Sequence, residues 1–375
     1  MLNRVLIDFS DLYSNLYQIN TKFRIGLCRF FQSEIFKDER DLHFLENFMI
    51  HTHLCDLLNI EHPIIQAGMG SFTSAELVAA VSNAGGLGVL GAAGRPLENL
   101  KVELEKIKHL TNKPFGVNYN ITNYTEESIA ISLESKVPVI STALGDPGDL
   151  VKKIHESGLL SMHQVHTRKQ ALQAKERDAD IIIAQGSEAG GYGQWVSSFP
   201  LIPQVVDAVK PVPVLAAGGI VDGRGFAAAL ILGAQGISMG TRFLASLEAP
   251  IEQEWKNMII HAESEDTVKT SFINELLPNG ALGYVTVPRA LSTEFIKKWD
   301  SKTEEVKKNA DQLRKEIGLA VMERKLHEYI PFTGESAGLI RDILPAADIV
   351  RKVVSEAREI LDHAQNMGMI KNLAR

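Results

Sequence analysis

Two glycine-containing segments have the residue types that bind a phosphate group. "VLAAGGIVDGRG" places Gly218 and Gly219 after one apolar run, and "GISMGTRF" places Gly240 and Thr241 after the next. Glycines at such points let backbone N–H groups approach an anion, and a helix that begins just beyond adds positive potential. The competing interpretation of either segment is an ordinary turn. Neither the GxxxxGK[ST] phosphate loop nor the GxGxxG dinucleotide pattern after a first strand occurs in the sequence.

Amide side chains end two other apolar runs. Asn118 and Gln185 each offer a donor and an acceptor that can read the edge of a flat heteroaromatic ligand. Either amide could instead be satisfied within its own loop. "QAGMG", residues 66–70, supplies a turn with exposed backbone, in which Met69 serves as packing or as a lid.

The stretch "IIIAQGSEAGGYGQW", residues 181–195, ends a strand-like run in a flexible turn that carries the aromatic hydroxyl of Tyr192. His163, near the end of another run, is a candidate for lining the same site, although a lone histidine is more often structural. His51 and His53 lack the carboxylate and the third ligand of a zinc site, so no metal is expected. The GxSxG elbow of a hydrolase triad is absent from the sequence.

Eight short apolar runs alternate with helical patterns and could place these residues together. Runs without polar alternation indicate strands buried on both faces, as in parallel sheets. "TSAE", residues 73–76, fits a capping box, and "VDGRGFAAALILGA" predicts a helix with Phe226, Leu230 and Ile231 on one face. The pattern predicts an α/β fold, a (β/α)8 TIM barrel with its site at the carboxyl ends of the strands; a doubly wound sheet is the competitor. The expected strands are residues 63–69, 87–92, 115–120, 137–142, 159–165, 180–185, 213–218 and 236–241.

The alternation of strand-like and helical segments ends after residue 246. Residues 247–334 read as an added, mainly helical insertion that covers the barrel mouth, and residues 335–375 return to the barrel of residues 49–246 with an amphipathic last helix. Residues 1–48 lack the pattern of a secretory signal and read as a loosely held extension or as sequence upstream of the true start.

Composition narrows the function class. The chain has 375 residues, of which 45% are hydrophobic and 23% charged, and a net charge of −7. Without a dense basic run, nucleic-acid binding is not expected. Cys28 and Cys55 are the two cysteines, which excludes a disulfide framework and favours a reducing, cytoplasmic location. No apolar stretch reaches the about 20 residues of a membrane span.

Five motifs in order, "HPIIQAGM", "FGVN", "AQGSEAGG", "AAGGI" and "GTRF", together with "GESAGLIRDILPAADIV" near the end, resemble the nitronate monooxygenase family. The resemblance covers about residues 50–360. It implies a barrel with an added helical domain that binds FMN without a metal. The flavin contacts implied are Ala67, Gly68, Met69, Asn118, Gln185, Gly190, Gly191, Gly218, Gly219, Ser238, Met239, Gly240 and Thr241.

Tyr192 departs from the family pattern, which usually has a histidine after the two glycines. That histidine is the proposed base that takes the α-proton of a neutral nitroalkane. A phenol with a pKa near 10 is a poor base at neutral pH. We therefore expect no direct use of nitroalkanes, whereas a nitronate is already deprotonated and could accept a hydrogen bond from Tyr192. The alternative is that Tyr192 only fills the pocket.

The resemblance leads to three hypotheses. The first is FMN-dependent oxidation of alkyl nitronates, such as the toxic propionate 3-nitronate, by oxygen: a monooxygenase with a detoxifying role and His163 and Tyr192 as its candidate catalytic residues. The second is an NAD(P)H-driven FMN reductase, similar to bacterial enoyl-acyl-carrier-protein reductases. The third is a flavin-binding protein that has lost its reaction. Expected partners are a small-molecule substrate, oxygen and a second copy of the chain in a homodimer.

Overall fold

The structure is a computed structural model that describes residues 50–276 and 286–369, and all of them belong to one compact unit, Ile50–Arg375. The predicted extension, residues 1–48, lies outside the described residues. Within the described chain, no helix has both the length and the apolar composition needed to cross a bilayer.

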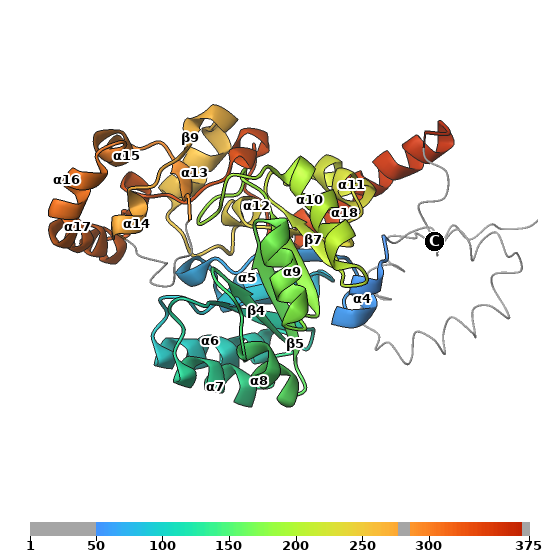
Figure 1. Ribbon diagram of the computed structural model, residues 1–375. Coiled ribbons are helices and arrows are strands. Elements are labelled where there is room, and N and C mark those ends of the chain that lie inside the picture. The colour runs from blue at the N-terminus through green and yellow to red at the C-terminus, as the bar shows by residue number, and fades with distance from the viewer. Residues whose placement is uncertain (1–49, 277–285, 370–375) are drawn as a thin grey trace, which may run out of the picture. The chain divides into compact units, whose positions relative to one another are not determined.

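Eight parallel strands close into a barrel in chain order (Figure 1). The ring closes where β1 pairs with β8, with Ile65 opposite Ser238. The predicted (β/α)8 barrel is therefore confirmed, and the doubly wound sheet is excluded. The strands are β1 Ile64–Gln66, β2 Leu87–Gly91, β3 Phe115–Asn120, β4 Val139–Ala143, β5 Leu160–Val165, β6 Ile181–Gln185, β7 Val214–Ala217 and β8 Gly236–Met239.

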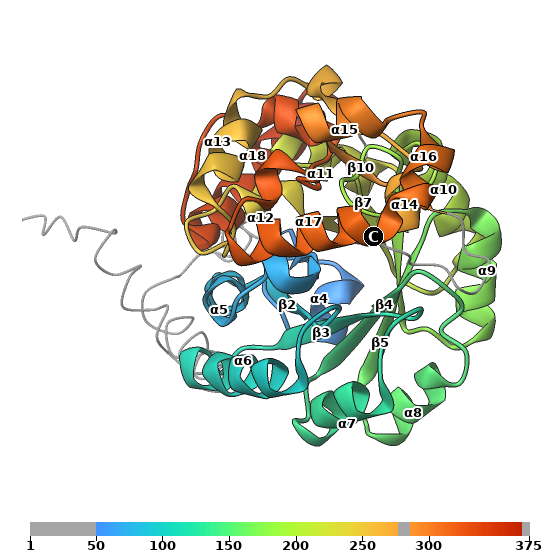
Figure 2. The ribbon, with the colours of Figure 1, turned by 90° about the vertical axis from the view of Figure 1, so that its left-hand side faces the viewer.

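Helices follow the strands and surround them (Figure 2). Met162, Ile183 and Leu215 belong to an apolar cluster drawn from six strands, which is the packed interior of the barrel. A short helix, α4 (His53–Leu58), adds Leu54 and Leu58 to that cluster. The surrounding helices are α5 Ala75–Asn83, α6 Leu97–Leu110, α7 Glu126–Glu134, α8 Leu150–Glu156, α9 Arg168–Glu176, α10 Ser198–Val209, α11 Gly223–Ile231 and α18 Ala346–Asn366.

The segment between β8 and α18 is mainly helical. It also contains a two-stranded antiparallel sheet of β9 (Thr267–Lys269) and β10 (Arg289–Leu291), which the sequence did not predict. Figure 1 shows α14 to α17 gathered in one group apart from α6 to α8. The helical elements are α12 Thr241–Leu244, α13 Gln253–His261, η2 Ser264–Asp266, α14 Ile273–Leu276, α15 Glu294–Trp299, α16 Thr303–Lys308, α17 Ala310–Met322, η3 Leu326–Glu328 and η4 Glu335–Leu339.

Two local predictions about helices were wrong. The cap of α5 is Ser74, whose side chain accepts from the backbone N–H of Leu77, so the box does not start at Thr73. The Thr73 hydroxyl instead accepts a 2.8 Å bond from the backbone of Gly91 and so joins β2 to the loop after β1. On α11, Phe226 is buried as predicted, but Ile231 is 55% exposed because it points away from the barrel.

Candidate active site

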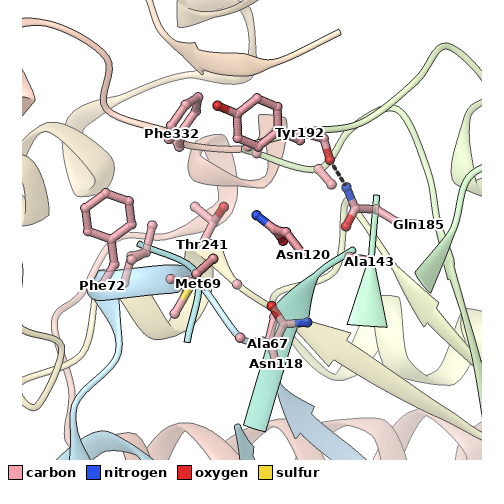
Figure 3. Close-up of a pocket in the computed structure, with 18 of the residues that line it drawn as sticks. Ala67, Met69, Phe72, Asn118, Asn120, Ala143, Gln185, Tyr192, Thr241 and Phe332 are labelled. Carbon is pink, nitrogen blue, oxygen red and sulfur yellow. Dashed lines mark hydrogen bonds between the residues drawn. The ribbon is translucent and has the colours of Figure 1, made fainter. Parts of the chain in front are cut away.

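A cavity of about 840 Å³ opens at the carboxyl ends of the barrel strands. This is the end at which barrel enzymes carry their active sites. Its volume lies toward the upper part of the about 300–1,000 Å³ of small-molecule sites, which leaves room for a cofactor and a second molecule. All but one of the predicted site residues line it: Ala67, Gly68, Met69, Asn118, Gln185, Gly190, Gly191, Tyr192, Gly218, Gly219, Ser238, Met239, Gly240 and Thr241 (Figure 3).

The turn after β7 forms a glycine cradle. Gly218 and Gly219 have φ of 94° and 75°, a conformation that favours glycine. A Cβ on Gly218 would lie 3.0 Å from the carbonyl oxygen of Gly186, so the space there is already filled. The backbone N–H groups of both glycines donate no hydrogen bond within the described residues. Free N–H groups at a cradle of this kind fit an anionic group.

The helix after this cradle does not contribute as predicted. The side chain of Asp222 accepts hydrogen bonds from the backbone N–H groups of Arg224 and Gly225 at the start of α11. The carboxylate of Glu356 accepts another, of 3.0 Å, from Gly223. Because two carboxylates already occupy this helix end, the predicted positive potential of α11 is not available to a ligand.

The turn after β1 fits closely against β3. A Cβ on Gly68 would lie 2.2 Å from the Cβ of Asn118, so only glycine allows this approach. The Asn118 Nδ2 donates to the hydroxyl of Ser141 at 3.3 Å. No hydrogen bond to its Oδ1 occurs within the described residues, so this oxygen can accept one from a ligand in the cavity.

Gln185 positions the turn that carries Tyr192. Its Nε2 donates to the backbone carbonyl oxygen of Tyr192 at 2.9 Å (Figure 3). The buried ring of His166 also hydrogen-bonds to the backbone of Tyr192, while burial lowers the pKa of His166 to about 4 and keeps it neutral. The tyrosine is therefore held by its main chain from two sides, and its side chain extends into the cavity.

The ring of Tyr192 packs against Phe332, with the ring centroids 5.5 Å apart and the planes tilted by 45°. Figure 3 shows the two rings side by side at one side of the cavity, with Phe72 nearby. Phe332 comes from the segment between η3 and η4, more than a hundred residues further along the chain. The aromatic wall of the site is therefore built from distant parts of the sequence.

A backbone bridge fixes the same turn from the other side. Gly191 and Arg289 exchange two main-chain hydrogen bonds, of 2.9 and 3.0 Å. The guanidinium of Arg289 is buried and lies 2.6 Å from the carboxylate of Glu335. It also donates to the carbonyl oxygen of Ser187 at 3.2 Å. A third partner is the hydroxyl of Thr267, to which the guanidinium donates at 3.0 Å. These contacts of one buried cation hold the turn against β10.

His163 does not reach the cavity. Alternation along β5 puts Met162 and Gln164 on the inside of the barrel, so His163 points outward toward the helices. Its Nδ1 lies 2.7 Å from the hydroxyl of Thr142, and the ring also hydrogen-bonds to the backbone of Gly145. Burial lowers its pKa to about 4. The structure gives His163 a structural role rather than the predicted place in the site.

The described lining is almost free of titratable groups. Apart from Tyr192, the single ionisable side chain among the described lining residues is Arg314. Its guanidinium already donates to the backbone of Glu275 at 2.7 Å and to Asp311 at 2.9 Å. Within the described residues there is also no cluster of His, Cys, Asp or Glu that could hold a metal. The described lining therefore offers a ligand mainly amides, hydroxyls, backbone groups and apolar side chains.

Sequence reasoning missed several lining residues. Asn120 and Gln164 lie two positions beyond Asn118 and Met162 on their strands, and strand alternation could have identified them. Phe332 and the apolar residues of α14, α17 and η3 had no such signal, because no motif links them to the barrel.

The fold and this cavity define a (β/α)8-barrel enzyme with a small-molecule site. The sequence pattern of the nitronate monooxygenase family matches residues 51–130 and 119–356, and the chain belongs to that family. The protein is therefore an oxidoreductase of this family.

Two curated relatives are similar to most of the chain. A 5-hydroxy-7a-methyl-1-oxo-octahydro-1H-indene-4-carboxyl-CoA dehydrogenase of Rhodococcus jostii is 31% identical over 84% of this chain and 97% of the relative. A probable nitronate monooxygenase of Staphylococcus saprophyticus is also 31% identical, over 84% of this chain and 99% of its own length.

Two solved structures share the fold. FabK from Thermotoga maritima superposes with a TM-score of 0.75 at 33% identity, covering 84% of this chain and 99% of its own. A nitroalkane oxidase from Streptomyces ansochromogenes gives a TM-score of 0.72 at 26% identity, covering 83% and 99%.

Proposed function

We propose that this protein is an FMN-dependent monooxygenase that oxidises alkyl nitronates, such as propionate 3-nitronate, with molecular oxygen. The observation that carries the proposal is the absence, among the described lining residues, of a side chain that could act as a base near neutral pH. A nitronate has already lost the proton that such a base would remove. The family and the nitroalkane oxidase relative support this reaction class.

The residues present fit FMN. The glycine cradle of Gly218 and Gly219, with Gly240 and Thr241 after β8, would hold the phosphate, as loops after strands seven and eight do in many barrels. The turn of residues 67–69 and the Oδ1 of Asn118 would contact the flavin ring. When bound, FMN would accept electrons from the substrate and pass them to oxygen.

The protein would bind, orient and shield the substrate. Tyr192 would donate a hydrogen bond from its phenol to a nitro oxygen. Its main chain is fixed by the side chain of Gln185 and, through the neighbouring Gly191, by the backbone of Arg289. Phe332 and Phe72 would exclude water on the apolar side. A neutral nitroalkane would react slowly, because a phenol with a pKa near 10 seldom removes a proton at pH 7.

A reductase or dehydrogenase is the second candidate, and one feature of the cavity favours it. The outer lining is apolar over Leu276, Ile317, Val321, Leu326 and Ile330, and this surface could contact a substrate larger than a short nitronate. The Rhodococcus relative is named for an acyl-CoA substrate. An NAD(P)H-driven FMN reductase of the enoyl-acyl-carrier-protein type would use this surface for an acyl chain.

Anaerobic mixing of the FMN-loaded protein with ethyl nitronate tests the first proposal. The visible flavin band should bleach and return when oxygen is admitted. If the band is unchanged with the nitronate but bleaches with NADH or NADPH, the reductase replaces the monooxygenase. If neither reagent bleaches it, the chain is a flavin-binding protein without either reaction.

The division into residues 1–48, the barrel of 49–246 with 335–375 and the insertion 247–334 stays a prediction, as do the homodimer and the cytoplasmic location.

A further inference from the structure

Asn120 lies in a second layer of the cavity, above the residues expected to contact the cofactor. It ends β3, two residues beyond Asn118, and both side chains point into the cavity. Two residues span about 6.6 Å along a strand, which is tilted relative to the barrel axis. Figure 3 shows the amide of Asn120 nearer to Tyr192 than that of Asn118. A molecule stacked on a flavin held at the level of Asn118 would therefore lie at the level of Asn120.

Gln164 belongs to the same layer. Asn120 lies opposite Ala143 on β4. The register of Thr142 with His163 puts Ala143 beside Gln164 on β5, one residue further on. Asn120, Ala143 and Gln164 all line the cavity. The amides of Asn120 and Gln164 thus lie on either side of the methyl group of Ala143, and this short side chain leaves open space between them.

The two amides have no other role in the fold. Within the described residues, neither the Asn120 nor the Gln164 side chain makes a hydrogen bond to protein. By contrast, Asn118 is bonded to Ser141 and Gln185 to Tyr192. A partly buried amide that lacks a hydrogen-bond partner in the protein favours binding of a ligand that can form a hydrogen bond with it.

We propose that Asn120 and Gln164 form a subsite for the two oxygens of a planar nitro, nitronate or carboxylate group. This deepens the proposed function, on which the assignment of the nitronate as physiological ligand rests. The backbones that carry the two amides are about 10 Å apart across two strand spacings. Two donors at hydrogen-bond distance from the two oxygens of a nitro group are at most about 8 Å apart. The spacing allows one oxygen to each amide.

The subsite is specific for oxygen acceptors rather than for charge. Neutral amide donors surround the site, and the one described cation of the lining, Arg314, is committed to Glu275 and Asp311. We infer that the position and number of the oxygens, more than the negative charge, select the ligand.

Isothermal titration calorimetry of the FMN-loaded protein tests the subsite without turnover. The probes are sodium propionate, which has two oxygens, and 1-propanol, which has one. Asn120→Ala and Gln164→Ala should each weaken propionate binding about tenfold or more and change propanol binding far less. Asn120→Asp should weaken propionate binding further, because a carboxylate repels the anion.

Asn112→Ala is the matched control, because Asn112 is exposed just before β3, at the opposite end of that strand. It should bind propionate as the wild type does. Thermal unfolding shows whether each variant folds. If Asn120→Ala does not fold, Gln164→Ala still tests the subsite.

Wild-type affinity for propionate in both alanine variants, or no binding of propionate by the wild type, would overturn the subsite. If the variants bind propionate more weakly while ethyl nitronate does not bleach the flavin of the wild type, the result supports the subsite and contradicts the proposed function.

Discussion

The backbone N–H of Arg289 donates a 2.9 Å hydrogen bond to the carbonyl oxygen of Gly191, and Gly191 returns one of 3.0 Å. This pair joins the mainly helical segment to the turn that carries Tyr192, although the two residues are almost a hundred positions apart. Gly191 has a φ of 73°, so a side chain there would strain the turn. The position of Tyr192 in the cavity therefore depends on the segment between β8 and α18.

Removing the Arg289 side chain should loosen this connection. Arg289→Ala leaves the carboxylate of Glu335 and the carbonyl oxygen of Ser187 without their cation. Because Glu335 is about a third exposed and can be hydrated, we expect the free energy of unfolding to fall by about 1–3 kcal/mol rather than by the full value of a buried pair. Urea unfolding of the wild type and the variant measures this difference in the free energy of unfolding. Lys297→Ala, which breaks the exposed pair with Glu294, should change the free energy of unfolding by less than about 0.5 kcal/mol.

Tyr192→His should add the oxidation of neutral nitroalkanes, which the proposed function does not include for the wild type. An ordinary imidazole has a pKa of about 6.5, so a histidine at this position can take the α-proton of a nitroalkane near neutral pH. We expect nitroethane to bleach the flavin of the variant about a hundredfold faster than that of the wild type. Tyr192→Phe is the control, because it removes the hydroxyl without adding a base. If Tyr192→His gains nothing, position 192 does not face the reacting carbon.

Gly218→Ala should weaken FMN binding. The φ of 94° costs an alanine about 1–2 kcal/mol, and its Cβ would press on the carbonyl oxygen of Gly186. The FMN dissociation constant, followed by flavin fluorescence, should rise about tenfold or more. Gly158→Ala is matched to it, because Gly158 has a φ of 73° with no atom within 4 Å and lies between α8 and β5. It should lose stability but keep its FMN affinity.

The buried histidines should make stability depend on pH. The pKa values of His163 and His166 are each lowered to about 4 by burial. Below pH 6.5 the unfolded chain binds protons that the folded protein accepts only near pH 4, so the free energy of unfolding falls as pH decreases through this window. Each histidine contributes about 1.4 kcal/mol per pH unit within it.

Urea unfolding between pH 4.5 and 7.5 measures that dependence. In His163→Gln one of the two groups is missing, so the slope of unfolding free energy against pH should be shallower than in the wild type. An equal slope would show that His163 does not carry the effect, whatever the variant's absolute stability.

The sequence predicts the barrel well and identifies many residues that line the cavity, for a physical reason. Strands buried on both faces appear as continuous apolar runs, and glycines at their ends mark where backbone approaches a ligand, as at Gly68 and Gly218. The orientation of His163 was mispredicted because a run without alternation hides which residues face inward. The capping of α11 by Glu356 and the contact of Phe332 with Tyr192 join residues distant in sequence, and no local pattern encodes such contacts.

The most direct test compares two forms of one substrate in the wild-type protein. Anaerobic stopped-flow mixing at pH 7 follows the flavin band after addition of either ethyl nitronate or neutral nitroethane. A cavity whose described lining offers no base predicts that the nitronate bleaches the flavin at least about a hundredfold faster. Comparable rates for both forms would contradict it, because the protein would then possess a base that removes the α-proton.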